Sequence, residues 1–507
     1  MKKILYTTIL AALASSQAFA QDAYDAANIT TQDLNGTARY VGMGGALSAL
    51  GADLTTIGTN PAGTALMRRN DCSVSFGGVF TSNAGAMGQD RGRFSFDNAS
   101  VVFAFPHDNS GEGLQFVNFG VGYNKGRNHI GNLFTGIDLD LDKGVFSQTN
   151  QIADMAEQCY KYDAWGMLAD MSAENTQKGH EHAGIICEDE QGYFGIPAKE
   201  ANYHRATYGS SSDVNVNLSF NVSDQFYFGA AVGIHSLGYS RQSFYEELGA
   251  DGNYYDFTNF YNTSGEGVDI KLGFICRPIA TSPFRFGVSV HTPTWYRLTD
   301  ECTSELHLND EFVMYGSSWD YGYELQYHFR TPWKFNFSLG TTIGNNFAIG
   351  AEYELTDFST GKYTPNGGGY SAYFNDINKY IGESLKAQHT FRIGAEYKPI
   401  QPLSLRLGYN YVTSPYYSDS YLSIPFDGHK TETDYTNWGA INRITAGIGY
   451  RWSTWYIDMA YQCQLQKGDF YAFDDYCTDQ KGNTYYLPAT SISNNRSQLL
   501  FTLGFKF

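Results

Sequence analysis

The feature that most constrains the fold of this chain is a strict alternation of apolar and polar residues. Residues 213–222 alternate without an error, with valine, leucine or phenylalanine at every second position and aspartate, asparagine or serine between them. A period of two places the two sets on opposite faces of a β-strand. The alternation at 323–339 is longer than an ordinary soluble strand of about 5–6 residues, and it suits a tilted membrane strand with extensions. In that stretch we expect Trp333 to face outward and Arg330 to face inward.

Segments of this kind recur along the chain and indicate about fourteen strands. They lie at about 72–82, 94–106, 114–134, 204–222, 225–246, 263–278, 283–310, 318–341, 346–362, 385–399, 403–418, 438–452, 454–468 and 493–507. Short connections alternate with long ones, as in a barrel with short periplasmic turns and long outer loops. The pattern predicts an all-β fold, a 14-stranded antiparallel transmembrane β-barrel with both termini on the periplasmic side, which spans residues 71–507.

Composition agrees with a barrel that meets lipid on one face and water on the other. The chain holds 39 Tyr, 35 Phe and 54 Gly, and its mean hydropathy is slightly negative. A secreted all-β sandwich array would share this composition, but it would not impose the alternation of loop lengths. The formal charge of −18 argues against nucleic acid as a partner, because phosphate binding needs a basic face.

The N-terminal region divides into two parts. Residues 1–20 are predicted to be a signal peptide, with Lys2 and Lys3 ahead of an apolar run and Ala18-Phe19-Ala20 at the cleavage site. Residues 21–70 have no strand to join and are small and Gly-rich, so we expect a hatch (plug) inside the lumen. Its motif residues are Gly42, Gly44, Gly45, Asn60, Pro61 and Ala62.

The last strand ends in an aromatic residue, Phe507, after apolar residues at every second position. This resembles the terminal signal that outer-membrane assembly machinery recognises. The largest outer loop, at about 135–203, contains a helical pattern at 151–171. Such a helix would cap the barrel mouth, form an apolar vestibule for a greasy ligand, or do both.

Ordered matches run from the hatch to the C-terminus. They are Gly42-Met43-Gly44-Gly45-Ala46, Gly51-Ala52-Asp53, Asn60-Pro61-Ala62-Gly63, Thr331-Pro332-Trp333, Tyr353-Glu354-Leu355-Thr356-Asp357-Phe358-Ser359, Gly394-Ala395-Glu396-Tyr397, Leu405-Arg406-Leu407-Gly408-Tyr409, Ser414-Pro415, Gly447-Ile448-Gly449-Tyr450 and Asp458-Met459-Ala460-Tyr461. In this order the sequence resembles the FadL/TodX-type family of outer-membrane transporters for long-chain fatty acids and other hydrophobic compounds.

The resemblance implies a fourteen-stranded barrel, an N-terminal hatch and inward movement of hydrophobic ligands. It also implies a kink in the third strand that lets ligand leave sideways, and Gly120, Gly122 and Gly126 are the candidate residues of such a lateral gate. The outer loop is longer than in the family's best-known members, so ligand contacts do not carry over to this chain.

Charged residues that the alternation directs into the lumen are the remaining candidates for chemistry. They are Arg330, Lys334, Glu352, Glu354, Arg392, Glu396, Arg406, Arg443 and Asp458. They would form ion pairs that fix the strand register, or one arginine would hold a ligand carboxylate in a bidentate pair. The pattern does not choose between these roles.

Other kinds of site have weak support. His180, His182 and Cys187 lack a fourth metal ligand, and Cys159/Cys187 and Cys463/Cys477 are possible loop disulfides. We expect no metal, no cofactor and no enzymatic activity.

The sequence therefore predicts a monomeric passive transporter in the cell outer membrane, with a hydrophobic small molecule and outer-membrane lipid as partners. The alternative is a barrel component of a secretion or surface-attachment machine that binds a protein partner. A polar porin is disfavoured by the hatch.

Overall fold

The structure is a computed structural model, and it describes the chain from Gln21 to Phe507 with gaps. The described residues are 21–82, 90–107, 112–137, 139, 146–158, 186–189, 192–250, 252–309, 311–317, 325–367, 371–423, 430–478 and 482–507. The predicted signal peptide at 1–20 lies outside these ranges, as do His180 and His182. None of the described helices is long and apolar enough to cross a bilayer.

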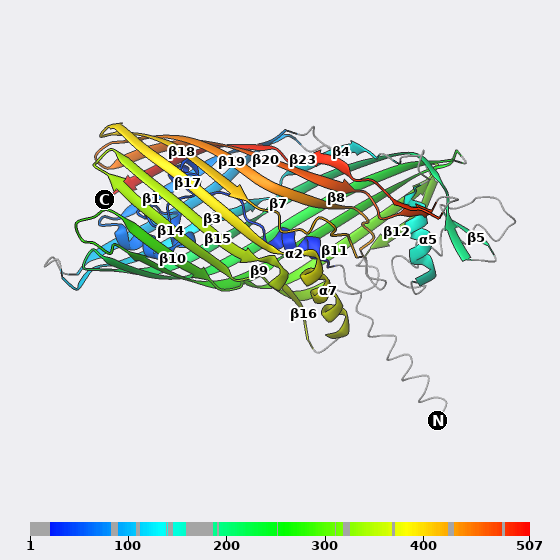
Figure 1. Cartoon of the computed structure of the whole chain (residues 1–507), viewed down its shortest axis with the longest axis horizontal. Coiled ribbons are helices and arrows are strands. Elements are labelled where there is room, and N and C mark those ends of the chain that lie inside the picture. The colour runs from blue at the N-terminus through cyan, green and yellow to red at the C-terminus, as the bar shows by residue number, and fades with distance from the viewer. Residues whose placement is uncertain are drawn as a thin grey trace, which may run out of the picture.

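The strands form one closed antiparallel barrel with fourteen positions, as predicted (Figure 1). Hydrogen bonds between the first and last strands close it, with Asp71 opposite Lys506 and Thr81 opposite Arg496. In chain order the fourteen positions are β1 (Asp71–Thr81), β2 (Gly92–Pro106), β3 (Leu114–Asn128), β7 (Ala198–Val222), β8 (Phe226–Gly249), β9 (Tyr254–Cys276), β10 with β11 (Arg285–His291, Trp295–Leu308), β13 with β14 (Leu325–Arg330, Lys334–Ile343), β15 with β16 (Phe347–Asp357, Lys362–Pro365), β17 (Ala387–Ile400), β18 (Leu403–Val412), β19 (Tyr435–Arg451), β20 (Trp455–Tyr471) and β24 (Arg496–Lys506).

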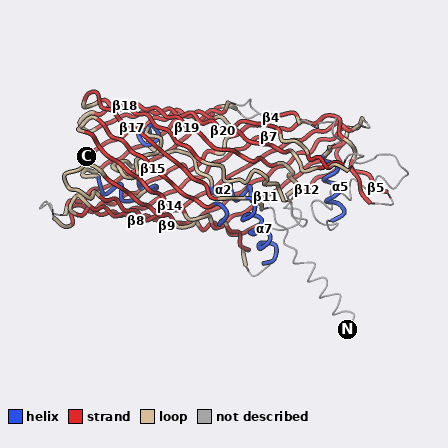
Figure 2. Tube along the Cα trace, in the orientation of Figure 1, coloured by secondary structure: helices blue, strands red, loops and turns tan. Residues whose placement is uncertain are grey.

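Smaller elements lie towards the end with the long loops. β4 (Gly131–Gly136) continues the position of β3 along β7, β12 (Glu311–Ser317) pairs with β11, and β23 (Thr490–Ser493) pairs with β20. The predicted helix at 151–171 is α5 (Gln148–Gln158) over the part that the structure describes. The other elements are β5 (Ile186–Asp189), β6 (Gly192–Gly195), η3 (Phe358–Thr360), α7 (Ser371–Ser384), β21 (Tyr476–Thr478) and β22 (Thr484–Tyr486). Figure 2 shows α7 on the side of the barrel, away from the end at which the C-terminus lies.

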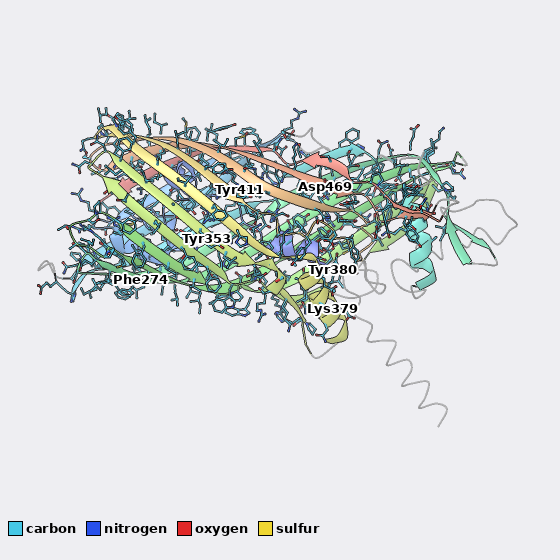
Figure 3. All side chains as sticks on the ribbon, viewed as in Figure 1. Phe274, Tyr353, Lys379, Tyr380, Tyr411 and Asp469 are labelled. Atoms are coloured by element: carbon cyan, nitrogen blue, oxygen red, sulfur yellow. The ribbon has the colours of Figure 1, made fainter. Side chains whose placement is uncertain are left out.

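The outer surface of the wall carries a belt of apolar side chains, and Figure 3 shows side chains projecting from the wall along its length. On β14 the exposed residues run from Trp333 through Phe335, Phe337 and Leu339 to Ile343. The belt ends where outward positions become polar, for example from Ile234 to Ser236 on β8. An apolar outer band of this kind is what a transmembrane barrel presents to lipid.

The N-terminal segment lies inside the barrel. It comprises α2 (Ala23–Thr30), α3 (Ala38–Gly42), α4 (Thr56–Thr59) and η1 (Pro61–Leu66), drawn in blue within the wall in Figure 1. α3 contacts β18, β19, β20 and β24, whereas η1 contacts β3, β7, β8 and β9. We call residues 21–70 the hatch segment.

The long alternating stretch at 323–339 is not one strand. It is split at Thr331-Pro332, and the side of the wall that the apolar residues face changes there: Phe329 is buried in the lumen, whereas Trp333 is 48% exposed on the outside. The neighbouring position is split in the same place, at Pro293, between β10 and β11. Proline has no N–H to donate to the strand ladder. Pro293 and Pro332 lie on neighbouring strand positions, so they interrupt both strands in the same place.

This interruption corrects one prediction. Arg330 is exposed on the outer surface and does not point into the lumen. Leu325, Tyr327 and Phe329 take the inward positions on β13, because the lumen at this level is filled by other aromatic side chains, including Tyr363.

Candidate functional site: the hatch and an opening in the wall

The Gly-rich part of the hatch segment docks on a row of glycines in the wall. Gly350, Gly394 and Gly408 are register partners on β15, β17 and β18. A Cβ on Gly394 would lie 2.1 Å from the carbonyl oxygen of Met43, and one on Gly408 would lie 2.2 Å from the backbone nitrogen of Gly44. Backbone therefore meets backbone here, which only glycine permits.

Gly44 and Gly45 have positive φ angles of 63° and 85°. Non-glycine residues rarely adopt this conformation. The hatch motif at 42–45 is thus a left-handed turn that fits the glycine row.

The second part of the hatch motif docks on a different part of the wall, β8 and β9. A Cβ on Gly229 would lie 2.3 Å from the carbonyl carbon of Pro61, and one on Gly273 would lie 2.1 Å from Oδ1 of Asn60. Asn60 is fully buried, and its side chain caps η1 by accepting a hydrogen bond from the Ala62 amide at 3.2 Å. Asn60 and Pro61 thus fix the turn that lies against β8 and β9.

Most of the predicted luminal charges form buried pairs around the hatch segment. The Arg406 side chain is fully buried between Glu396, at 2.7 Å, and Asp458. Arg39 of the hatch segment approaches the same Glu396 carboxylate at 3.4 Å. These pairs join β17, β18 and β20 to one another and to the hatch segment, and the choice between register fixing and ligand binding stays a prediction.

The remaining predicted charges also lie in the lumen, apart from Arg330. Arg392 bonds to Glu354 at 3.1 Å and to Glu352 at 3.4 Å, and Glu352 accepts from the Ser48 amide. Lys334 donates to Gln32 at 2.8 Å.

The wall ladder is incomplete between β2 and β3. Their pairing ends at Asn98 and Asn124, and β3 has a register shift against β7 between Lys125 and Arg127. Beyond that point, residues of the hatch segment take over the hydrogen bonds. The Asp33 amide donates to the Gly126 carbonyl at 2.8 Å, and Asn35 donates to the Lys125 carbonyl at 3.1 Å and to Asp97 at 2.8 Å.

The three candidate gate glycines lie in different settings. Gly126 lies at the register shift, inside the opening. Gly120 and Gly122 lie lower on β3, where a Cβ would come within 3.3 Å and 3.2 Å of the Ile57 side chain. These two glycines make room for the hatch segment, and the break in the ladder comes after them.

Three arginines converge on one carboxylate beside this opening. Asp33 lies 3.3 Å from Arg496 and 3.8 Å from Arg443, and Arg127 is the third. Burial raises the pKa of Asp33, but the three guanidinium groups outweigh burial and lower the pKa overall. The cluster carries three positive charges against one negative charge. The sequence signalled Arg443, but it gave no reason to group Arg127 and Arg496 with it.

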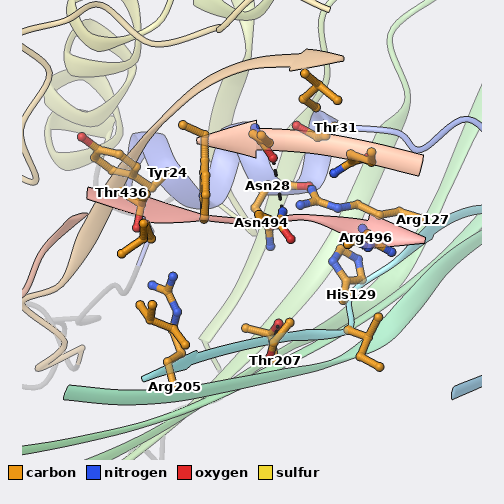
Figure 4. A pocket seen from close by; sticks show the side chains of 18 of the residues that line it. Tyr24, Asn28, Thr31, Arg127, His129, Arg205, Thr207, Thr436, Asn494 and Arg496 are labelled. Carbon is orange, nitrogen blue, oxygen red and sulfur yellow. Dashed lines mark hydrogen bonds between the residues drawn. The ribbon is translucent and has the colours of Figure 1, made fainter. Parts of the chain in front are cut away.

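Two cavities meet at this cluster. The larger has a volume of about 180 Å³ and the other about 130 Å³, and Asp33 lines both. Figure 4 shows the larger cavity, with Arg127, His129 and Arg496 on one side and Tyr24 of α2 on the other. Arg127 donates to the Asn28 carbonyl of α2 at 2.6 Å. Charged and polar side chains line both cavities. The apolar vestibule expected at the 151–171 helix is a different place and stays a prediction.

An ion-pair cluster holds α2 at the top of the larger cavity. Lys430 contacts Asp22 at 2.6 Å and Asp25 at 2.7 Å. Burial, together with the nearby charge of Asp22, raises the pKa of Asp25 to about 7. The pKa of Lys430 is also raised, because its two carboxylate partners outweigh burial.

The predicted loop disulfides have one outcome among the described residues. Cys463 on β20 is a free thiol, so the bridge from Cys463 to Cys477 is not formed. Cys159 lies outside the described residues.

Comparison of the whole chain with solved structures finds the same architecture elsewhere. A Pseudomonas aeruginosa FadL homologue matches 94% of this chain and 99% of its own, with a TM-score of 0.52 and 13% identity. This chain has the FadL fold. The Pseudomonas putida toluene transporter TodX matches over the same shares, with a TM-score of 0.50 and 12% identity. No family model and no curated protein matches the sequence.

Proposed function

We propose that this FadL-fold barrel is a passive outer-membrane transporter for hydrophobic compounds with an acidic headgroup, long-chain fatty acids among them. The observation that carries the proposal is the excess of positive charge at the β2–β3 opening. Arg127, Arg443 and Arg496 face Asp33, and an arginine can bind a carboxylate through two parallel hydrogen bonds. A ligand carboxylate would balance part of this charge.

The same place offers an exit to the bilayer. The wall there has no β2–β3 ladder beyond Asn124, and the hatch segment closes the gap through hydrogen bonds that are each worth only about 1 kcal/mol net. Release of Asn35 and Asp33 from β3 would open the wall beside the cavity. The ligand's acyl chain would then pass sideways into lipid, which needs no energy source.

Uptake assays separate the headgroup from the chain. Vesicles that contain the protein should take up oleate faster than empty vesicles, and should favour oleate over oleyl alcohol, which has a chain of the same length. Arg127→Gln should reduce oleate uptake several-fold and leave uptake of the alcohol unchanged. Arg277→Gln is the matched control, because Arg277 donates to the backbone of its own turn at Ser282.

Oleate uptake no faster than in empty vesicles would refute transport. Equal uptake of oleate and oleyl alcohol, unaffected by Arg127→Gln, would refute recognition of an acidic headgroup but not transport itself. The solved neighbours named above are a FadL homologue and a toluene transporter, and neither supports the alternative of a docking component for a protein partner.

A further inference from the structure

The outward position of Arg330 draws attention to the outer surface at the upper edge of the apolar belt. Register pairs place Trp295 of β11 opposite Arg330 of β13, and Arg330 opposite Lys362 of β16. All three side chains are exposed. One row up, Arg297 lies opposite His328. Three cations therefore lie on adjacent strands, which are spaced by about 4.8 Å.

An apolar hollow lies directly below these cations. Its volume is about 510 Å³, and it is lined by Pro293, Trp333, Phe335 and Leu355, with Arg330 at its edge. The Trp333 and Phe335 rings are nearly parallel, at 17°, and their centroids lie 6.4 Å apart. The hollow exists because the paired prolines interrupt the strands at this level. It opens outward, away from the luminal cavities.

Two carboxylates lie near these cations, those of Glu266 and Asp357, and among the described residues neither forms an ion pair with them. Arg297 lies opposite Glu266 on β9 and donates to Gln326 at 3.0 Å. The Asp357 carboxylate, in the wall of the hollow, accepts from the Ser359 amide and hydroxyl. Among the described residues, Arg330 and Lys362 form no side-chain ion pair or hydrogen bond. Two exposed cations thus remain next to an apolar hollow at the level where lipid headgroups begin.

We propose that this place binds a phosphate-bearing lipid of the outer leaflet, with its phosphate on Arg330 and Lys362 and an acyl chain in the hollow. The cations lie above the aromatic and aliphatic side chains. This arrangement matches a lipid whose headgroup points outward. Phosphate fits better than a carboxylate, because two cations on adjacent strands suit a group with several charged oxygens. The hollow is comparable in size with known small-molecule sites of about 300–1,000 Å³.

The test uses the purified full-length barrel and bis-phosphorylated lipid A as the probe, with binding measured by native mass spectrometry. Wild-type protein should bind this lipid at least tenfold more tightly than its dephosphorylated form. The double variant Arg330→Gln/Lys362→Gln should bind it about 30-fold more weakly than the wild type. Lys379→Gln is the control, because Lys379 is exposed on α7 and paired with Glu383.

The acyl part and the folding of the variants are checked separately. Trp333→Ala should weaken binding of both lipid forms, because it removes the wall of the hollow. Heat-modifiable electrophoretic mobility reports whether each barrel is folded. If the double variant does not fold, Lys362→Gln alone, on the short strand β16, should still weaken binding about fivefold.

Three results would overturn the proposal. These are equal affinity for the two lipid forms, wild-type affinity in the folded double or Lys362 variant, and full displacement of the lipid by inorganic phosphate at millimolar concentration. Oleate uptake should remain at the wild-type level in the double variant. A parallel loss of uptake and lipid binding would overturn the assignment of a separate lipid site.

Discussion

Replacement of Gly394 by alanine tests whether the hatch segment is held by backbone contact with the glycine row. The new Cβ would lie 2.1 Å from the Met43 carbonyl oxygen, whereas real Cβ contacts are essentially never below 3.0 Å, so the hatch segment or β17 must move by about 0.9 Å. The Met43 carbonyl also accepts from the Ala46 amide at 3.1 Å, and that bond would be strained. Overpacking costs about 1–3 kcal/mol and the strained hydrogen bond about 1 kcal/mol.

A total of about 2–4 kcal/mol would raise the undocked population of the hatch segment by about 30-fold to 700-fold, at 1.4 kcal/mol per factor of ten. Two assays report undocking: tryptic cleavage after Arg39, which is largely buried beside Glu396 when docked, and ion conductance in planar bilayers. Gly238→Ala is the control, because a Cβ there would have its nearest contact at 3.9 Å.

Both variants should keep heat-modifiable mobility, which shows that the barrel has assembled. If Gly394→Ala matches the wild type and Gly238→Ala in both cleavage and conductance, the reasoning that backbone contact holds the hatch segment is refuted.

Three further predictions concern the hatch segment and its ion pairs. The double variant Asn60→Ala/Pro61→Ala removes the cap of η1, which costs about 1 kcal/mol, and should raise leak or uptake without preventing assembly. Unchanged leak and uptake would show that the motif contributes only to packing. Glu396→Gln leaves the fully buried Arg406 with Asp458 as its remaining acid and should lower the unfolding free energy by about 3–5 kcal/mol, in contrast to Glu383→Gln on α7. The pKa of Asp25, raised to about 7 from its ordinary 3.8, contributes stability that is present below pH 3.8 and is lost as the pH rises through about 7. The thermal midpoint of the wild type should therefore fall more between pH 5 and 8.5 than that of Asp25→Asn, which keeps the contribution of Glu247, whose pKa burial also raises to about 7; parallel curves would contradict this.

Sequence periodicity was sufficient for the strand count and the barrel, because each strand has one face in lipid and one in the lumen. It failed at Arg330, because period two says which residues share a face and not which face is outside. Above the lipid belt the lumen is itself lined by aromatic residues such as Tyr327 and Phe329. An alternating run therefore continued in the sequence although the chain switched sides at Pro332.

The candidate site was predictable only in part. The hatch motif could be recognised in the sequence because small residues with no strand to pair with must pack closely against another part of the chain. The wall opening was indicated only by the family resemblance, through Gly126. The residues themselves did not show it, because its evidence is the absence of β2–β3 bonds beyond Asn124 and their replacement by Asp33 and Asn35. Hydrogen bonds between residues about 90 positions apart leave no local pattern.

The two docking places of the hatch segment bear on how such a barrel is built. η1 rests on β7, β8 and β9, from the first half of the chain, whereas α3 rests on β18, β19 and β20, from the second half. The N-terminal segment is synthesised before any of these strands. It can therefore act as a template while the barrel assembles, because a sheet that curls around it brings the strands made last to the correct distance from those made first. The hatch segment, which stays inside the folded barrel, would then set the position at which β1 and β24 pair.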